Sequence, residues 1–185
     1  MRWFISYLYL KINGWKIHAG NLREIKRCVM IVAPHTSMMD FFIGRAAFYC
    51  MHLKNVKFLI KREMFKFPIG WIIKSLGAIP IDRSRGNNTV KEASELFNKY
   101  QNIYLLLTPE GTRKKTAKWK KGFYQIAMNA GVPIAMLYMD YEKKEGGLGG
   151  ILYPTGDFDK DFESVKSLYK NVSAKHPENF NPDFK

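Results

Sequence analysis

His35 and Asp40 are the pair of side chains in this sequence best suited to acid–base chemistry. His35 directly follows an apolar run at 28–34, and Asp40 lies five residues later, where a helix is expected to begin. A turn between a strand and a helix can bring such a carboxylate back to one imidazole nitrogen. The carboxylate then fixes the tautomer and leaves the other nitrogen as a general base. The same spacing also fits a first-turn acid beside an unrelated loop histidine.

Two further groups of polar residues follow apolar runs that are typical of strands. Residues 109–113 read Pro-Glu-Gly-Thr-Arg after the run at 103–107, and residues 82–86 read Asp-Arg-Ser-Arg-Gly after the run at 77–81. A carboxylate, a glycine and a guanidinium in one turn can hold an anionic or hydroxylated ligand near a backbone amide. Two close arginines suit phosphate recognition, because each offers a planar fork of N–H donors. A surface salt bridge and a solvated loop are the structural alternatives.

The apolar pattern along the chain predicts alternating strands and helices. Buried strands are expected at 28–34, 56–60, 77–81, 103–107 and 132–141. A first helix is expected to begin after Thr36 or Ser37, and a second to cover about 63–75 with a break at Pro68. A third is expected to begin at a capping box at Thr89, and two more to lie at 123–130 and around 162–172. The glycine-rich stretch 142–150 is expected to be a flexible loop. This alternation predicts a single α/β domain with a largely parallel central sheet flanked by helices.

Composition and charge indicate an anionic partner. The chain has 30 Lys+Arg against 16 Asp+Glu, a formal charge of +14 and 15% aromatic residues. Charge alone permits DNA, RNA or an anionic lipid surface. A basic nucleic-acid-binding module is the alternative from another functional class, but no RRM, KH or helix-turn-helix signature supports it. Nucleic acid is therefore not the expected partner.

The first residues favour contact with a lipid surface. Residues 1–14 are expected to form a short amphipathic interfacial segment, with Trp3, Tyr7 and Tyr9 at headgroup depth. The segment is too short to span a bilayer. A terminal element packed on the core is the alternative. Basic clusters at 54–66 and 113–121 would add attraction to an anionic membrane surface.

Four short motifs occur in an order that resembles the glycerolipid acyltransferase family, which comprises 1-acylglycerol-3-phosphate and lysophospholipid acyltransferases. The family has H-x4-D, G-x-I-x-I-x-R, P-E-G-T-R and V-P-I segments in this order. Here they fall at 35–40, 77–83, 109–113 and 132–134. The resemblance covers about residues 15–140, and it implies that 15–185 form an acyltransferase domain.

The resemblance implies O-acyl transfer from acyl-CoA or acyl-carrier protein to a hydroxyl of a lysolipid, with no bound cofactor. No ligand spacing in the sequence indicates a bound metal. His35 would be the base that takes the hydroxyl proton, and Asp40 would orient it. The hydroxyl would attack the thioester directly, without an acyl-enzyme. The implied substrate-binding residues are Lys61, Arg83, Glu110, Gly111, Thr112 and Arg113.

The sequence departs from the family pattern at positions near these motifs. Thr108 precedes the third motif, where an aromatic residue is usual, and Lys114 follows it, where serine is common. The acceptor thus stays open between 1-acylglycerol-3-phosphate, giving phosphatidic acid in phospholipid biosynthesis, and another lysolipid such as a lyso-aminolipid. A peripheral place at the cytoplasmic face of the inner or plasma membrane is expected. An inactive lipid-binding member is a further alternative, against which the intact His35–Asp40 pair argues.

Overall fold

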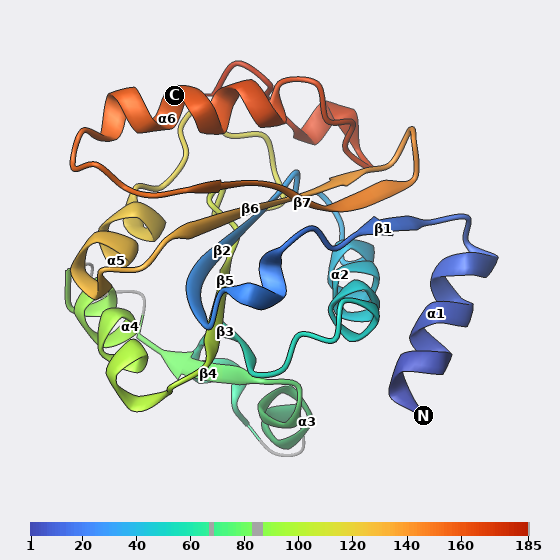
Figure 1. Cartoon of the computed structure of the whole chain (residues 1–185), viewed down its shortest axis with the longest axis horizontal. Coiled ribbons are helices and arrows are strands. Elements are labelled where there is room, and N and C mark those ends of the chain that lie inside the picture. The colour runs from blue at the N-terminus through green and yellow to red at the C-terminus, as the bar shows by residue number, and fades with distance from the viewer. Residues whose placement is uncertain (67–68, 83–86, 185) are drawn as a thin grey trace.

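The structure, a computed structural model, describes residues 1–66, 69–82 and 87–184. Within these residues the chain forms one seven-stranded sheet in the order β1-β7-β6-β2-β5-β3-β4, with helices on both faces (Figure 1). The strands are β1 (Lys16–His18), β2 (Arg27–Ala33), β3 (Val56–Lys61), β4 (Ala78–Ile81), β5 (Ile103–Leu107), β6 (Ile134–Asp140) and β7 (Glu145–Leu152). The helices are α1 (Arg2–Ile12), α2 (Met39–Cys50), α3 (Ile69–Ser75), α4 (Asn87–Lys99), α5 (Gly122–Ala130) and α6 (Phe158–Tyr169).

The centre of the sheet is parallel, as the alternation of elements predicts. Strands β6, β2, β5, β3 and β4 pair in parallel. Parallel neighbours need a crossover connection, and α2, α3, α4 and α5 each lie between two of these strands in the chain. All five strands therefore end at the same edge of the sheet, where the polar residues that follow β2 and β5 meet.

The prediction of a flexible loop at 142–150 is wrong, because β7 occupies most of that stretch. It pairs antiparallel with β6, from Ile134 opposite Leu152 to Asp140 opposite Glu145, and on its other side with β1. Its glycines permit close packing of neighbouring backbones. A Cβ on Gly147 would lie 2.0 Å from the carbonyl oxygen of His18, so no other residue fits there. Glycine here indicates close approach of strands rather than mobility.

Two apolar layers cover the faces of the sheet. Alternate residues of β2 and β5 point to opposite sides, since the side-chain period of a strand is two. Val29, Ile31 and Leu105 join the layer under α4, α5 and α6, whereas Met30 and Tyr104 join the layer under α2. The sheet is thus buried on both faces, which agrees with its continuous apolar strands.

Helix α1 packs on the outer side of α2 and leaves most of its apolar residues exposed. Its only buried residues are Ser6 and Leu10, and Leu10 packs with Ile43 and Ala46 of α2. The exposed apolar side chains are Trp3, Phe4, Ile5, Tyr7, Leu8 and Ile12. Across the described ranges, no helix combines the length and apolar character that crossing a membrane requires.

Two helix boundaries differ from the sequence expectation. Helix α4 begins at Asn87, so Thr89 is not its N-cap, and the Thr89 hydroxyl instead donates a hydrogen bond to the Asp82 carbonyl. The stretch expected as one helix at 63–75 holds a 3-10 turn at Arg62–Met64 and the separate helix α3. The predicted break at Pro68 lies outside the described residues.

Candidate active site

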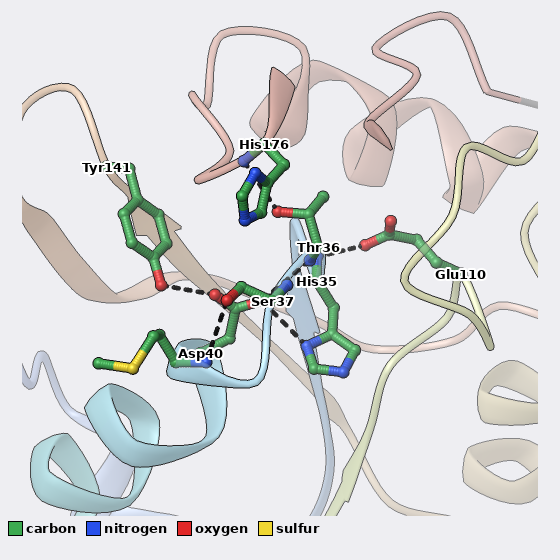
Figure 2. A network of polar contacts seen from close by, with 8 residues as sticks. His35, Thr36, Ser37, Asp40, Glu110, Tyr141 and His176 are labelled. Carbon is green, nitrogen blue, oxygen red and sulfur yellow. Dashed lines mark hydrogen bonds and ion pairs between the residues drawn. The ribbon is translucent and has the colours of Figure 1, made fainter. Parts of the chain in front are cut away.

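His35 and Asp40 meet at the carboxyl end of β2. Strand β2 ends at Ala33, and Asp40 occupies the first turn of α2. The chain bends back between them, so that His35 Nδ1 lies 3.1 Å from Asp40 Oδ2 (Figure 2). The sequence prediction that the acid contacts one imidazole nitrogen is confirmed. The ring is partly exposed, with 22% of the side chain accessible, whereas the Asp40 side chain is 1% exposed.

The Asp40 carboxylate is held by four donors. Its Oδ2 accepts the backbone N–H groups of Thr36 and Ser37, both at 2.9 Å, as well as His35 Nδ1. Its Oδ1 accepts the Tyr141 hydroxyl at 2.5 Å. Burial alone would raise the pKa of Asp40, but the hydrogen bonds from His35, Tyr141 and Ser37 outweigh it and keep the pKa below its ordinary value. Asp40 is therefore a carboxylate at neutral pH.

This arrangement assigns the protonation of the His35 ring. An ionised carboxylate only accepts hydrogen bonds, so the neutral ring carries its proton on Nδ1. Nε2 is then the unprotonated nitrogen with a lone pair, as a general base requires. A positively charged ring, once formed, would be stabilised by the same carboxylate.

Glu110 supports the site from behind. It is 3% exposed, and its Oε1 accepts the backbone N–H of His35 at 2.7 Å. Burial raises the pKa of Glu110 to about 7, although the hydrogen bond from His35 opposes the shift. Glu110 is not among the residues that line the neighbouring cavity. Through this hydrogen bond Glu110 holds the His35 loop, and its expected part in shaping the acceptor site stays a prediction.

The C-terminal segment closes the other side of the loop. The backbone N–H of His176 donates to the Thr36 hydroxyl at 3.2 Å (Figure 2). The fully buried Tyr169 hydroxyl donates to the carbonyls of Ile31 and Leu137, 3.3 and 2.9 Å away. These contacts join α6 and the segment after it to strands β2 and β6. Residues far apart in the sequence thus fix the backbone on which His35 stands.

A cavity of about 650 Å³ opens in front of His35. This volume lies within the range of ligand pockets, about 300–1,000 Å³. Apolar side chains of α2 and of the sheet line one part of the wall, here called the apolar lobe: Val32, Phe41, Phe48, Val56, Phe58 and Leu106. The rest of the wall combines apolar residues such as Phe123 and Ile126 with polar ones, which include His35, Asp40, Arg45, Thr112, Arg113, Lys120 and Gln125. Such a cavity suits a molecule with a hydrocarbon chain and an anionic or hydroxylated end.

The structure brings some of the predicted substrate-binding residues together and leaves others apart. Gly111, Thr112 and Arg113 line the cavity, so the third motif lies beside His35. Gly111 has a φ of +66°, and a Cβ there would lie 2.7 Å from the Lys120 side chain. Lys61 is exposed at the end of β3 and is not part of the cavity wall. Arg83 lies outside the described residues.

Sequence reasoning missed three residues of the site: Tyr141, Arg45 and Lys120. Tyr141 follows β6 and is 101 residues from Asp40 in the chain, so no local spacing links the two. Arg45 follows Asp40 by five residues on α2, about 1.4 turns at 3.6 residues per turn, so helical periodicity does not place the two on one face. Lys120 is one of a run of basic residues, and nothing in that run distinguishes it. Among the described residues, no cluster of His, Cys, Asp and Glu could hold a metal ion.

Comparison with protein families shows which family the chain belongs to. The family described as Acyltransferase matches residues 16–140, which include β2, the His35–Asp40 loop and the third motif. The chain belongs to the acyltransferase family. The resemblance inferred from the four motifs is thereby confirmed, and the matched residues end at the last residue of β6.

Two proteins similar to this acyltransferase family member carry related names. A 1-acyl-sn-glycerol-3-phosphate acyltransferase from Cocos nucifera is 28% identical over 126 residues, which cover 65% of this chain and 38% of that protein. The chain thus matches less than half the length of that relative. The crystal structure of the 1-acyl-sn-glycerophosphate acyltransferase PlsC from Thermotoga maritima has a similar fold, with a TM-score of 0.60 at 20% identity. The match covers 90% of this chain and 75% of that one.

Proposed function

We propose that this chain is an O-acyltransferase that moves a fatty acyl group from a thioester donor to a hydroxyl of a lysolipid. The observation that supports this most directly is the position of His35. It pairs with a buried carboxylate through Nδ1 and stands in the wall of a cavity with a large apolar lobe. A base beside a hydrocarbon-sized space is the arrangement that acylation of a lipid alcohol needs.

The proposed reaction is a direct transfer. His35 Nε2 takes the proton of the acceptor hydroxyl while that oxygen forms a bond to the thioester carbonyl carbon. The tetrahedral intermediate then breaks its carbon–sulfur bond, and the departing thiolate takes the proton back from the imidazolium. Asp40 stabilises the imidazolium between these two proton transfers. Protons and electrons balance without an oxidant or a metal.

No covalent acyl-enzyme is part of the proposal. The residues that line the described cavity include no serine or cysteine. Cys28 is fully buried in the layer under α2, and burial raises the pKa of its thiol to about 12. Ser37 uses its hydroxyl to accept the backbone N–H of Met39 at 3.1 Å. The acceptor hydroxyl is therefore the nucleophile in this scheme.

For the acceptor we propose 1-acylglycerol-3-phosphate, which would give phosphatidic acid. Arg113 and Lys120 line the polar wall, and no carboxylate of the described residues is within ion-pair distance of either one. Two unpaired cations favour a phosphate, and a guanidinium can bind it with two parallel N–H groups. The names of the two similar proteins agree with this choice. The acyl donor in this proposal is either acyl-CoA or acyl-carrier protein.

We also propose that α1 attaches the protein peripherally to a membrane, on the cytoplasmic face of the inner or plasma membrane. Phe4, Ile5 and Leu8 are 61%, 60% and 45% exposed, a cost that burial in lipid would remove. Lys11 is the basic residue in the last turn of α1, which has no acid in its first turn. A lysolipid could then pass from the lipid layer to the cavity without crossing bulk water.

The test is a matrix of substrates followed by mass spectrometry. Purified protein receives one acyl-CoA and one acyl-carrier protein as donors, each with 1-acylglycerol-3-phosphate or a lyso-aminolipid as acceptor. We expect phosphatidic acid to form fastest, and the His35→Ala variant to make none while keeping the native circular dichroism spectrum. If only the lyso-aminolipid gave product, the proposed acceptor would be wrong, but the proposed acyl transfer would stand. Undiminished turnover by His35→Ala would refute the mechanism.

A further inference from the structure

Arg45 is a charged side chain in the cavity wall, and the protein itself uses only part of its hydrogen-bonding capacity. It lies on α2 among the cavity-lining residues Phe41, Gly44 and Phe48. Its Nε is enclosed and has no hydrogen-bond partner, the only such buried side-chain atom in the described parts of the chain. A buried N–H without an acceptor costs about 1–3 kcal/mol, and more when the group is charged. The buried Nε has no surface that a ligand could reach, so a ligand in the cavity would bind the terminal nitrogens of the guanidinium, of which only Nη2 is bonded to a described residue.

The guanidinium is already held in one orientation. Its Nη2 donates to the Tyr49 hydroxyl at 3.0 Å, and its central carbon lies 4.7 Å from the centre of the Tyr49 ring. Within the described residues, no carboxylate is close enough to Arg45 to form an ion pair. A guanidinium oriented in this way, with its charge unmatched, suits a carboxylate or phosphate that presents two oxygens.

We infer that Arg45 binds an anionic oxygen group, a carboxylate or a phosphate, of the substrate that occupies this cavity. The inference rests on the proposed acyl transfer for its choice of ligand, and it deepens that proposal by adding an anion contact on α2. This contact is separate from Arg113 and Lys120, which come from the segment between β5 and α5.

The spacing along α2 favours the acceptor head group as the source of the anion. Arg45 follows Asp40 by five residues, which is about 7.5 Å along a helix axis. In a lysolipid the anionic group is only a few bonds from the reacting hydroxyl, so both can lie within this span. The phosphate of a pantetheine thioester is far more distant from its reacting carbonyl. The donor remains the second source of the same chemistry, and the experiment separates the two.

The first arm measures binding without turnover. Calorimetric titrations use octanoyl lysophosphatidic acid, N-octanoylserine and the neutral mono-octanoylglycerol, all below their micelle concentrations. For Arg45→Met we expect a loss of about 10- to 100-fold in affinity for one or both anionic ligands. The affinity for the neutral ligand should change by less than about 2-fold. Arg45→Lys keeps the charge but loses the fork, so its losses should be intermediate.

The second arm repeats the titrations with octanoyl-CoA and the neutral thioester octanoyl-N-acetylcysteamine. A selective loss for octanoyl-CoA alone would assign the anion to the donor and keep the anion-binding role of Arg45. Lys99→Met, which removes one exposed cation at the end of α4, is the matched control and should bind every ligand as the wild type does.

Two results would overturn the inference: unchanged binding of all charged ligands by Arg45→Met, or equal losses for charged and neutral ligands. Should the Arg45→Met variant fail to fold, Arg45→Lys supplies the same comparison. A protein that binds these ligands through Arg45 but transfers no acyl group would refute the proposed function and leave this inference standing.

Discussion

Tyr141 and His35 contact opposite oxygens of the same carboxylate. The Tyr141 hydroxyl donates to Asp40 Oδ1, and His35 Nδ1 faces Asp40 Oδ2. The Tyr141 ring is itself held edge-on by Trp15, with the ring centres 5.0 Å apart. Asp40 is therefore fixed from the far side by a residue that follows β6 and packs beside the start of β1.

Tyr141→Phe should weaken catalysis through Asp40. The variant removes one hydrogen bond to a buried carboxylate, so the pKa of Asp40 should rise towards its ordinary value. Asp40 stays ionised at neutral pH in both proteins, but it is held less firmly against His35 Nδ1, so kcat should fall by about 10-fold with little change in KM. Steady-state acyl transfer at neutral pH measures both parameters. An unchanged kcat, or a rise in KM that accounts for the whole loss, would show that Tyr141 does not act through Asp40.

Asp40→Asn should be more damaging than Tyr141→Phe. The amide is neutral, so it neither stabilises an imidazolium nor requires the proton on His35 Nδ1. We expect kcat to fall by about 10²- to 10⁴-fold, the range over which general bases contribute. The Oδ1 atom of asparagine can still accept the backbone N–H groups of Thr36 and Ser37, so the loop should keep its shape. Single-turnover assays test the rate, and an activity within about 3-fold of the wild type would contradict the proposed role.

Glu110 should make stability fall as the pH rises. Its pKa is about 7 in the folded chain against an ordinary value of 4.5, so the folded state binds the proton more tightly than the unfolded state. The resulting stability is full below pH 4.5, declines between 4.5 and 7, and is absent above that window. The gap corresponds to about 3 kcal/mol at 1.36 kcal/mol per pH unit.

Glu110→Gln isolates this contribution. Glutamine does not ionise, and its side-chain oxygen can still accept the His35 N–H. Urea unfolding at pH 5, 6, 7 and 8 should therefore give a flatter profile for the variant than for the wild type. Parallel profiles for the two proteins would mean that Glu110 does not titrate in this window.

The sequence predicted the parallel strands well, because continuous apolar runs mark strands that are buried on both faces. It fails at β7, because glycine-rich stretches are typical of loops, whereas these glycines permit the close approach of β1 and β6. It also misplaced the start of α4, since Thr89 fits a capping box but bonds to the Asp82 carbonyl instead. In both cases the residue type permits more than one local structure, and contacts with residues distant in the sequence select the one that forms.

In the site, too, the sequence predicts the local contacts but not those between distant parts of the chain. His35 and Asp40 were predictable because five residues across a strand-to-helix turn set their contact locally. Tyr141 and the burial of Glu110 were not, because each depends on the order of strands in the sheet. The place of β5 beside β2 brings Glu110 to the His35 backbone, and the place of β6 on the other side of β2 brings Tyr141 to Asp40.

Gly44 should limit the room for the acyl chain. It lies within α2 in the cavity wall, and a Cβ built on it meets no atom within 4 Å. Glycine inside a helix costs about 0.5–1 kcal/mol relative to alanine, although nothing in the fold requires it here. Gly44→Ala should therefore raise the melting temperature and keep long-chain transfer. Gly44→Leu should fill the lobe and lower transfer of a 16-carbon acyl group more than that of an 8-carbon group. Equal losses for the two acyl groups would mean that the acyl chain does not bind in this lobe.

The exposed apolar side of α1 should control attachment to lipid. Phe4, Ile5 and Leu8 point away from α2, so changing all three to glutamine leaves the buried Leu10 contact in place. Each side chain contributes about 1–2 kcal/mol when it enters an interface, so the triple variant should move from vesicles to solution in a flotation assay with anionic phospholipids. Met128→Gln with Tyr153→Gln removes exposed apolar residues from α5 and from the segment after β7, which lie on the other side of the sheet from α1 (Figure 1). That control should float as the wild type does. Unchanged flotation of the triple variant would mean that another surface binds the membrane.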